Sequence, residues 1–182
     1  MIVSLVRDTG IADARRMATL DPAPPTLSGT KRYRHILLPL DGSETAEAAL
    51  PDAASVAASN GARVTLLHVV PPALAEIYAA AQTIPVDQEE GAGRDAAHRY
   101  LDSVRRKLRA VGIDTHTAVT IGDAADAVLA YADEENVDLI AMATHGRSGW
   151  KRWVLGSVAE KVLRAASQPV LLVRAPPAAA ER

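Results

Sequence analysis

The sequence contains no cysteine, no phenylalanine and no excess of basic charge. The lack of cysteine excludes disulfides, thiol catalysis and thiolate metal sites in this chain. Its 20 basic and 22 acidic side chains give a formal net charge of -2. A chain with this balance lacks the positive field that non-specific nucleic-acid binding requires, so we expect no nucleic-acid partner.

Long apolar runs are also missing from the sequence. No stretch reaches the length of a membrane-spanning helix, and the opening MIVSLV is too short for the core of a signal peptide. The charged residues Arg7 and Asp8 follow it at once. We therefore expect a cytoplasmic protein with no membrane partner.

Aromatic residues make up only 3% of the chain, although 48% of its 182 residues are hydrophobic. A core of this composition must be built from Ala, Val, Leu and Ile, which is typical of helices that cover a buried parallel sheet. The length suits one domain rather than two. We expect an N-terminal extension and proline-rich linker over residues 1–30, one domain over 31–175 and a C-terminal tail over 176–182.

Short apolar runs bounded by glycine, proline or charged residues predict five strands. These strands lie at residues 35–40, 64–70, 115–121, 137–143 and 170–173. After the first strand, helical spacing predicts a helix that begins at Ser43, is kinked at Pro51 and ends at Gly61. Residues 73–93 form the least regular internal stretch, because Pro85 and two glycines interrupt it.

Three more helices follow from the same reasoning. The second carries one apolar stripe, closed by Gly112, and its members are Ala97, Leu101, Val104, Leu108 and Val111. The third is capped by Asp123 and carries Ala124, Ala127, Val128 and Tyr131. The last helix is expected over residues 157–166. Five strands alternating with four helices predict an α/β fold, a doubly wound parallel sheet with helices on both faces.

A glycine-rich loop follows the fourth strand, in the segment AMATHGRSGWKRWVLGSV of residues 141–158. Backbone N–H groups at Gly146 and Gly149 can surround phosphate oxygens, and Gly156 and Ser157 present the positive end of the following helix. This arrangement suits an anion such as a nucleotide phosphate. The alternative interpretation is that the glycines only allow the chain to turn from strand to helix.

This segment, together with HILLPLDGSETAEAAL at residues 35–50, resembles the universal stress protein family. The family motif is a glycine, two residues, a second glycine, nine residues, and a glycine followed by Ser or Thr. Gly146 takes the place of the second glycine, and Gly156 and Ser157 close the motif after nine residues. Ala143 replaces the first glycine, and its methyl group narrows the approach of a ligand to the strand end. The resemblance extends from about Tyr33 to Arg174 and implies the strand order 3-2-1-4-5.

The resemblance also implies ATP, with Mg²⁺, as the ligand. It places Asp41 on the adenosine side, although Asp41 before Gly42 also fits a plain turn aspartate. Pro39 and Val69 resemble positions of the adenine pocket. The full set of predicted ligand residues is Pro39, Asp41, Val69, Met142, Ala143, Gly146, Arg147, Gly149, Gly156, Ser157 and Val158.

Three functions fit these observations. The first is a dimeric ATP-binding stress-response module that regulates other proteins and has at most slow hydrolysis. The second is a dimeric interaction protein of the same fold that does not bind nucleotide, which Ala143 favours. The third is a phosphotransferase or hydrolase that uses Asp41 to bind magnesium. It is disfavoured because the sequence offers one carboxylate and no catalytic base for such a reaction. For the first two functions, we expect a homodimer that forms through the last strand, residues 170–173.

Other phosphate and catalytic motifs are missing from the sequence. It contains no GxxxxGK[ST] string, and no GxGxxG follows the first strand. The five histidines show no spacing that links them to a nucleophile or to a zinc site. We therefore expect no dedicated catalytic centre, and the sequence leaves the presence of a metal site open.

Overall fold

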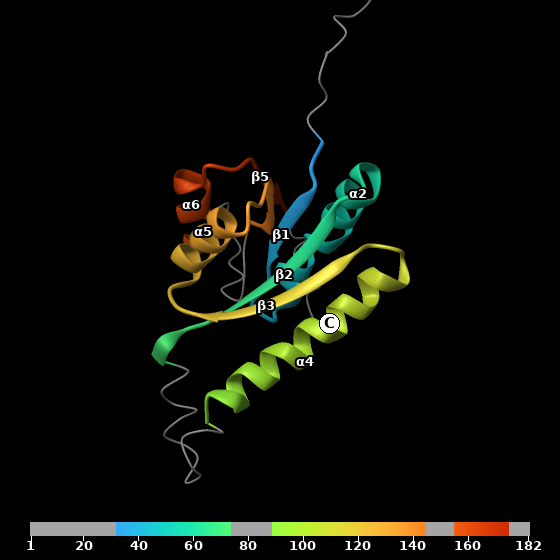
Figure 1. The fold of residues 1–182 in the computed structure, drawn as a ribbon. Helices are drawn as coiled ribbons and strands as arrows, with labels where there is room; N and C mark the ends of the chain where they lie inside the picture. The colour runs from blue at the N-terminus through green and yellow to red at the C-terminus, as the bar shows by residue number, and fades with distance from the viewer. Residues whose placement is uncertain (1–31, 74–88, 145–154, 175–182) are drawn as a thin grey trace, which may run out of the picture. The chain divides into compact units, whose positions relative to one another are not determined.

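The computed structural model describes residues 32–73, 89–144 and 155–174. Its strands are β1 (His35–Pro39), β2 (Arg63–Val70), β3 (Thr115–Ile121), β4 (Leu139–Ala143) and β5 (Val170–Val173). Its helices are α1 (Glu44–Glu47), α2 (Leu50–Asn60), α4 (Glu89–Ala110), α5 (Ala124–Glu134) and α6 (Ser157–Ala165). Strands and helices alternate along the chain, with the short α1 and α2 together between β1 and β2 (Figure 1).

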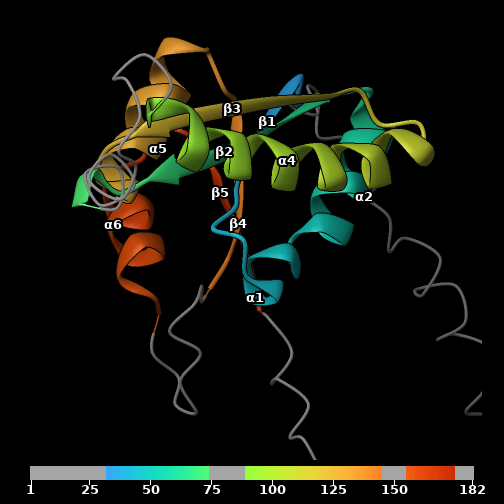
Figure 2. The ribbon, with the colours of Figure 1, turned by 90° about the horizontal axis from the view of Figure 1, so that it is seen from below.

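The five strands form one parallel sheet in the order β3-β2-β1-β4-β5, which confirms the predicted fold and strand order. The helices α5 and α6 lie on one side of this sheet, and α2 and α4 lie on the other (Figure 1). Figure 2 shows α6 and α1 on opposite sides of β4. The chain therefore moves to the other face of the sheet between β3 and β4, and the strand order reverses at β1 and β4.

Two apolar cores fill the spaces between the sheet and its helices. Alternate residues of one strand face opposite cores: Leu38 packs toward α1, α2 and α4, and Leu37 packs toward α5 and α6. The α2 side is built on alanine, because Ala49, Ala53 and Ala57 are at most 1% exposed. Small side chains at the contact allow the helix to lie close to the sheet, so a tight core forms without phenylalanine.

The predicted helix ends in the first half of the chain are confirmed. Ser43 caps α1, and its hydroxyl accepts the N–H of Ala46 at 3.1 Å. Pro51 lies in the first turn of α2, so the predicted helix is divided into α1 and α2 at this point. Gly61 ends α2 in the left-handed conformation, with φ of 65°.

The prediction that Val111 belongs to the buried stripe of its helix is wrong. The helix α4 ends at Ala110, and the Val111 side chain is 68% exposed. Gly112 adopts a φ of 81°, which turns the chain so that Ile113 enters the core in place of Val111. The helical spacing of apolar residues therefore extends to Val111, one residue beyond the end of α4.

Three further features differ from the sequence predictions. The stretch 73–93 was expected to be irregular, but α4 already begins at Glu89 and runs through its two glycines. Each glycine costs about 1 kcal/mol in a helix, and the many later residues of α4 that pack against the sheet outweigh this cost. The strand β4 begins at Leu139 rather than Val137. The face of α5 that is buried consists of Ala125, Val128 and Ala132.

Among the residues that the structure describes, no helix is both long enough and apolar enough to cross a membrane. The longest, α4, has 22 residues and carries many charged side chains.

Candidate functional site

A cleft of about 260 Å³ opens at the carboxyl ends of the central strands, where the strand order reverses. Ligands of open α/β sheets bind at this place, because the chain leaves β1 and β4 toward opposite faces. The cleft is lined by Pro39, Leu40, Asp41, Ala46, Leu67, Val69, Ala124, Val128, Met142, Ala143, Thr144, Gly156, Ser157, Val158 and Ala159.

Eight of the eleven predicted ligand residues are among those lining residues. Gly146, Arg147 and Gly149 lie outside the described residues. The structure thus brings the residues predicted to hold the base and the start of α6 to one cleft. Whether each of these residues contacts a ligand stays a prediction.

One end of the cleft is an apolar slot. Leu67 and Val69 reach it from β2, and Val128 and Ala124 reach it from α5. Leu67 and Val128 are at most 1% exposed, so the slot continues the core between the sheet and α5. A flat apolar group such as a nucleobase suits these walls.

Sequence reasoning missed three of these slot residues, although a signal for them was present. Leu67 lies two positions before the predicted Val69, and residues two apart on a strand share a face. Ala124 and Val128 are four positions apart on α5, so they also share a face. That α5 forms a wall of the cleft is a tertiary fact that its own spacing does not contain.

Asp41 stands at the rim of the cleft, directly after β1. Its Oδ1 accepts the backbone N–H of Ser43 at 3.0 Å and the Ser43 hydroxyl at 2.6 Å. Gly42 between them has a φ of 83°, a conformation that glycine adopts without strain. Asp41 is therefore a turn aspartate and a lining residue of the cleft at the same time, so the two interpretations of this residue do not exclude each other.

The other end of the cleft is formed by the first turn of α6. The Gly156 N–H donates to the Thr144 carbonyl at 2.8 Å, so this group anchors the helix to the end of β4. The N–H groups of Ser157 and Val158 belong to the first turn, where a helix supplies no acceptor of its own. Together with the partial positive charge of the helix end, these two groups suit an anion.

Ala143 is the last residue of β4 and is 7% exposed. Its side chain lines the cleft and also belongs to the core on the α1 and α2 side. The methyl group that replaces the family's first glycine thus belongs to a lining residue of the cleft, and that it narrows the approach to the strand end stays a prediction.

A salt-bridged cluster ties α6 to the start of α5, next to the cleft. Lys161 Nζ lies 2.8 Å from Asp126 Oδ1 and 3.2 Å from Asp123 Oδ1. Hydrogen bonds to Asp126 and Asp123 raise the pKa of Lys161, and the Asp126 backbone N–H followed by Lys161 lowers the pKa of Asp123. Because two carboxylates already face this ammonium group, it adds little positive potential to the cleft.

The described residues hold no group of three or more histidine, aspartate or glutamate side chains that could bind a metal ion. Asp41 is the one carboxylate among the lining residues of the cleft. A magnesium ion at this cleft would therefore take most of its oxygen ligands from phosphate groups and water.

A sequence model described as "Universal stress protein family" matches residues 32–174. The chain belongs to the universal stress protein family. The matched range includes all five strands and every lining residue of the cleft.

Individual universal stress proteins are similar to this chain over most of their own length. MJ0577 of Methanocaldococcus jannaschii is 28% identical over 154 residues, which cover 78% of this chain and 95% of that protein. YxiE of Bacillus subtilis is 29% identical over 147 residues, covering 78% of this chain and 99% of its own.

The solved structure of MJ0577 has a TM-score of 0.70 at 28% identity, covering 80% of this chain and 99% of its own. Two further structures share the fold at lower identity. A universal stress protein in complex with cAMP has a TM-score of 0.60 at 21% identity, covering 80% of this chain and 100% of its own. A universal stress protein from Archaeoglobus fulgidus in complex with dAMP has a TM-score of 0.54 at 23% identity. The match covers 78% of this chain and 98% of that protein.

Proposed function

We propose that this universal stress protein binds ATP, with Mg²⁺, in the cleft at the ends of β1 and β4, and that the bound nucleotide regulates its contacts with other proteins in the cytoplasm. The observation that carries this proposal is the pairing of an apolar slot with the first turn of α6 in one cleft. The slot fits a base, and the first-turn N–H groups fit a phosphate.

Two further observations support the proposal. Proteins of the same fold have been solved with cAMP and with dAMP, so this fold accommodates adenine nucleotides. The lining that the structure describes contains one carboxylate, which is already engaged by Ser43, and no histidine. A site with this lining has little to activate a water molecule, so we expect binding with at most slow hydrolysis.

The second candidate function is a dimeric interaction protein that keeps the fold without binding nucleotide. Ala143 favours it, because its methyl group lies in the cleft wall where the family motif has glycine. The two functions differ in one measurable property, the affinity for nucleotide.

Addition of ATP with Mg²⁺ is expected to raise the melting temperature of the protein. A ligand at a hundred times its dissociation constant adds about 2.7 kcal/mol to the free energy of unfolding. For a chain of this size, that corresponds to roughly 5 to 10 °C. Differential scanning fluorimetry on the wild type and on Ala143→Gly measures it, and the glycine variant should show the larger shift. If millimolar ATP moves neither protein, the second candidate function is correct.

The proposed assembly is a homodimer through β5. This strand lies at the edge of the sheet, and all four of its side chains are only half-buried within one chain. Pairing with a second copy would cover both its backbone groups and its apolar side chains.

Leu171→Asp is expected to weaken this association, because a carboxylate at the contact would have to lose its water. Light scattering over a concentration series gives the mass, and circular dichroism shows whether the variant is folded. Ala58→Asp, at an exposed position on α2, is a control because it adds the same single negative charge away from β5. A monomeric mass of the concentrated wild type would disprove the dimer.

A further inference from the structure

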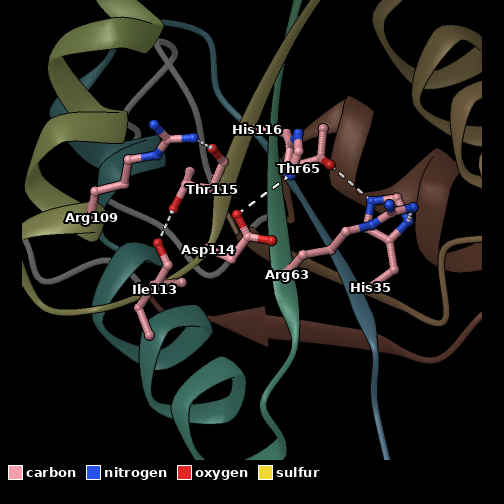
Figure 3. A network of polar contacts seen from close by, with 8 residues as sticks. All are labelled: His35, Arg63, Thr65, Arg109, Ile113, Asp114, Thr115 and His116. Atoms are coloured by element: carbon pink, nitrogen blue, oxygen red, sulfur yellow. Dashed lines mark hydrogen bonds and ion pairs between the residues drawn. The ribbon is translucent and has the colours of Figure 1, made fainter.

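A buried imidazole lies at the end of the sheet opposite the cleft. His35, the first residue of β1, is 4% exposed, and its Nε2 is 2.8 Å from the hydroxyl of Thr65 on β2 (Figure 3). Its Nδ1 is 3.2 Å from the Glu135 carbonyl oxygen and 3.1 Å from a guanidinium nitrogen of Arg63. Thr65 is itself 3% exposed, so water has little access to this contact.

These partners suit a neutral imidazole ring in either tautomer. If Nδ1 carries the proton, it donates to the Glu135 carbonyl, and Nε2 accepts from the Thr65 hydroxyl. If Nε2 carries the proton, it donates to Thr65, and Nδ1 accepts from Arg63. An imidazolium would place a second positive charge 3.1 Å from the Arg63 guanidinium. Burial first, and then Arg63, lower the pKa of His35.

The same residue holds the turn between α5 and β4. The Asp138 carboxylate accepts the N–H of Arg34 at 2.8 Å and that of His35 at 3.3 Å. The Asp138 N–H in turn donates to the His35 carbonyl at 3.0 Å. Asn136, in this turn, has a φ of 52°, which is unusual for a residue other than glycine. The turn over residues 135–138 is thus attached to the start of β1 through both the ring and the backbone of His35.

The charged and titratable groups around the ring come from several elements. Arg63 opposes protonation, while the hydrogen bond to the Glu135 carbonyl and the Asp138 and Glu135 carboxylates favour it, and the effect of burial together with Arg63 is the larger. Tyr131 of α5 lies next to Thr65, and on β3 His116 is in register with Thr65 and forms an ion pair with Asp114 at 3.5 Å. The charged and titratable groups on the elements around the ring include Arg34, Arg63, Asp114, His116, Tyr131, Glu135 and Asp138.

We propose that His35 and the turn over residues 135–138 form an acid-sensitive latch, in which protonation of the buried ring releases this turn from the start of β1. The ring must leave its site to be hydrated once it is charged, and its contact with the Glu135 carbonyl, which attaches the turn to the ring, is then lost. Because the pKa of His35 is lower in the folded chain than the usual 6.5, the latch contributes its full stability above that value. The contribution is lost as the pH falls below 6.5 and through the lower folded value.

Thermal unfolding between pH 7.5 and pH 5.0 tests the latch. The melting temperature of the wild type should fall by roughly 3 °C more than that of His35→Gln, which keeps a neutral donor and acceptor but cannot take up the proton. His116→Gln is the matched control, because it removes an exposed histidine from the neighbouring strand. It should show the full pH dependence of the wild type. Equal pH dependence of the wild type and His35→Gln would overturn the proposal.

A measurement on the wild type alone decides the matter even if His35→Gln does not fold. The ring signals of His35, followed by nuclear magnetic resonance, should titrate below pH 6.5. Protection of the Arg34 and Asp138 amides against hydrogen exchange, relative to other strand amides, should decrease over the same pH range. A titration midpoint at or above 6.5, or protection that does not change with the ring, would contradict the latch.

Discussion

Ser157→Glu should bind ATP at least about tenfold more weakly than the wild type, a loss of about 1.4 kcal/mol, while its affinity for adenosine changes little. Ser157 opens α6 and lines the cleft. A carboxylate there would meet the phosphate groups with a like charge. The same carboxylate is favourable at the start of a helix, so the variant should fold at least as well as the wild type. Isothermal titration calorimetry with the two ligands measures the difference.

Ser167→Glu is the matched control for this variant. Ser167 is exposed and lies just beyond the other end of α6, so the change in net charge is the same but the cleft is not altered. This control should bind ATP like the wild type. An equal loss of ATP and adenosine affinity in Ser157→Glu would mean that the start of α6 does not interact with phosphate.

Leu108→Ala is expected to lower the free energy of unfolding by about 2 to 5 kcal/mol. Leu108 is 5% exposed and packs in the core between the sheet and α1, α2 and α4, so its truncation leaves a cavity. The melting temperature should decrease by roughly 5 to 15 °C. Urea unfolding followed by circular dichroism gives the free energy directly.

Val111→Ala is the matched comparison, three residues further along the chain. Because Val111 is 68% exposed, its truncation should change the free energy of unfolding by no more than about 0.5 kcal/mol. A loss of similar size in both variants would show that Val111 is buried after all, as its spacing alone suggests.

The sequence contains enough local information to place every strand along the chain, with an error of two residues at the start of β4. Thr115–Ile121 is rich in β-branched residues and Val170–Val173 is a short apolar run, and the structure has both strands at the predicted residues. The order of the strands is a different matter. It followed from the resemblance to a family, because alternation of strands and helices alone fits several doubly wound sheets.

The errors arose where tertiary structure outweighs local spacing. Val111 continues the spacing of Leu108, and only the backbone turn at Gly112 removes it from the core. The glycines near the start of α4 indicated a loop, yet packing of the later turns carries the helix through them. For the cleft, the strand ends were predictable, but the wall formed by Val128 depends on how α5 crosses the sheet.

Two parts of the chain meet where β1 pairs with β4, a contact that we call the seam. Strands β1, β2 and β3 come from the first part of the chain and β4 and β5 from the last, and the two sets meet where Ile36 and Leu37 pair with Leu139 and Ile140. The cleft lies at the end of this seam and has walls from both sets. A molecule bound in the cleft would therefore contact both sets of strands. The binding free energy of such a molecule would add to the free energy needed to separate the two sets.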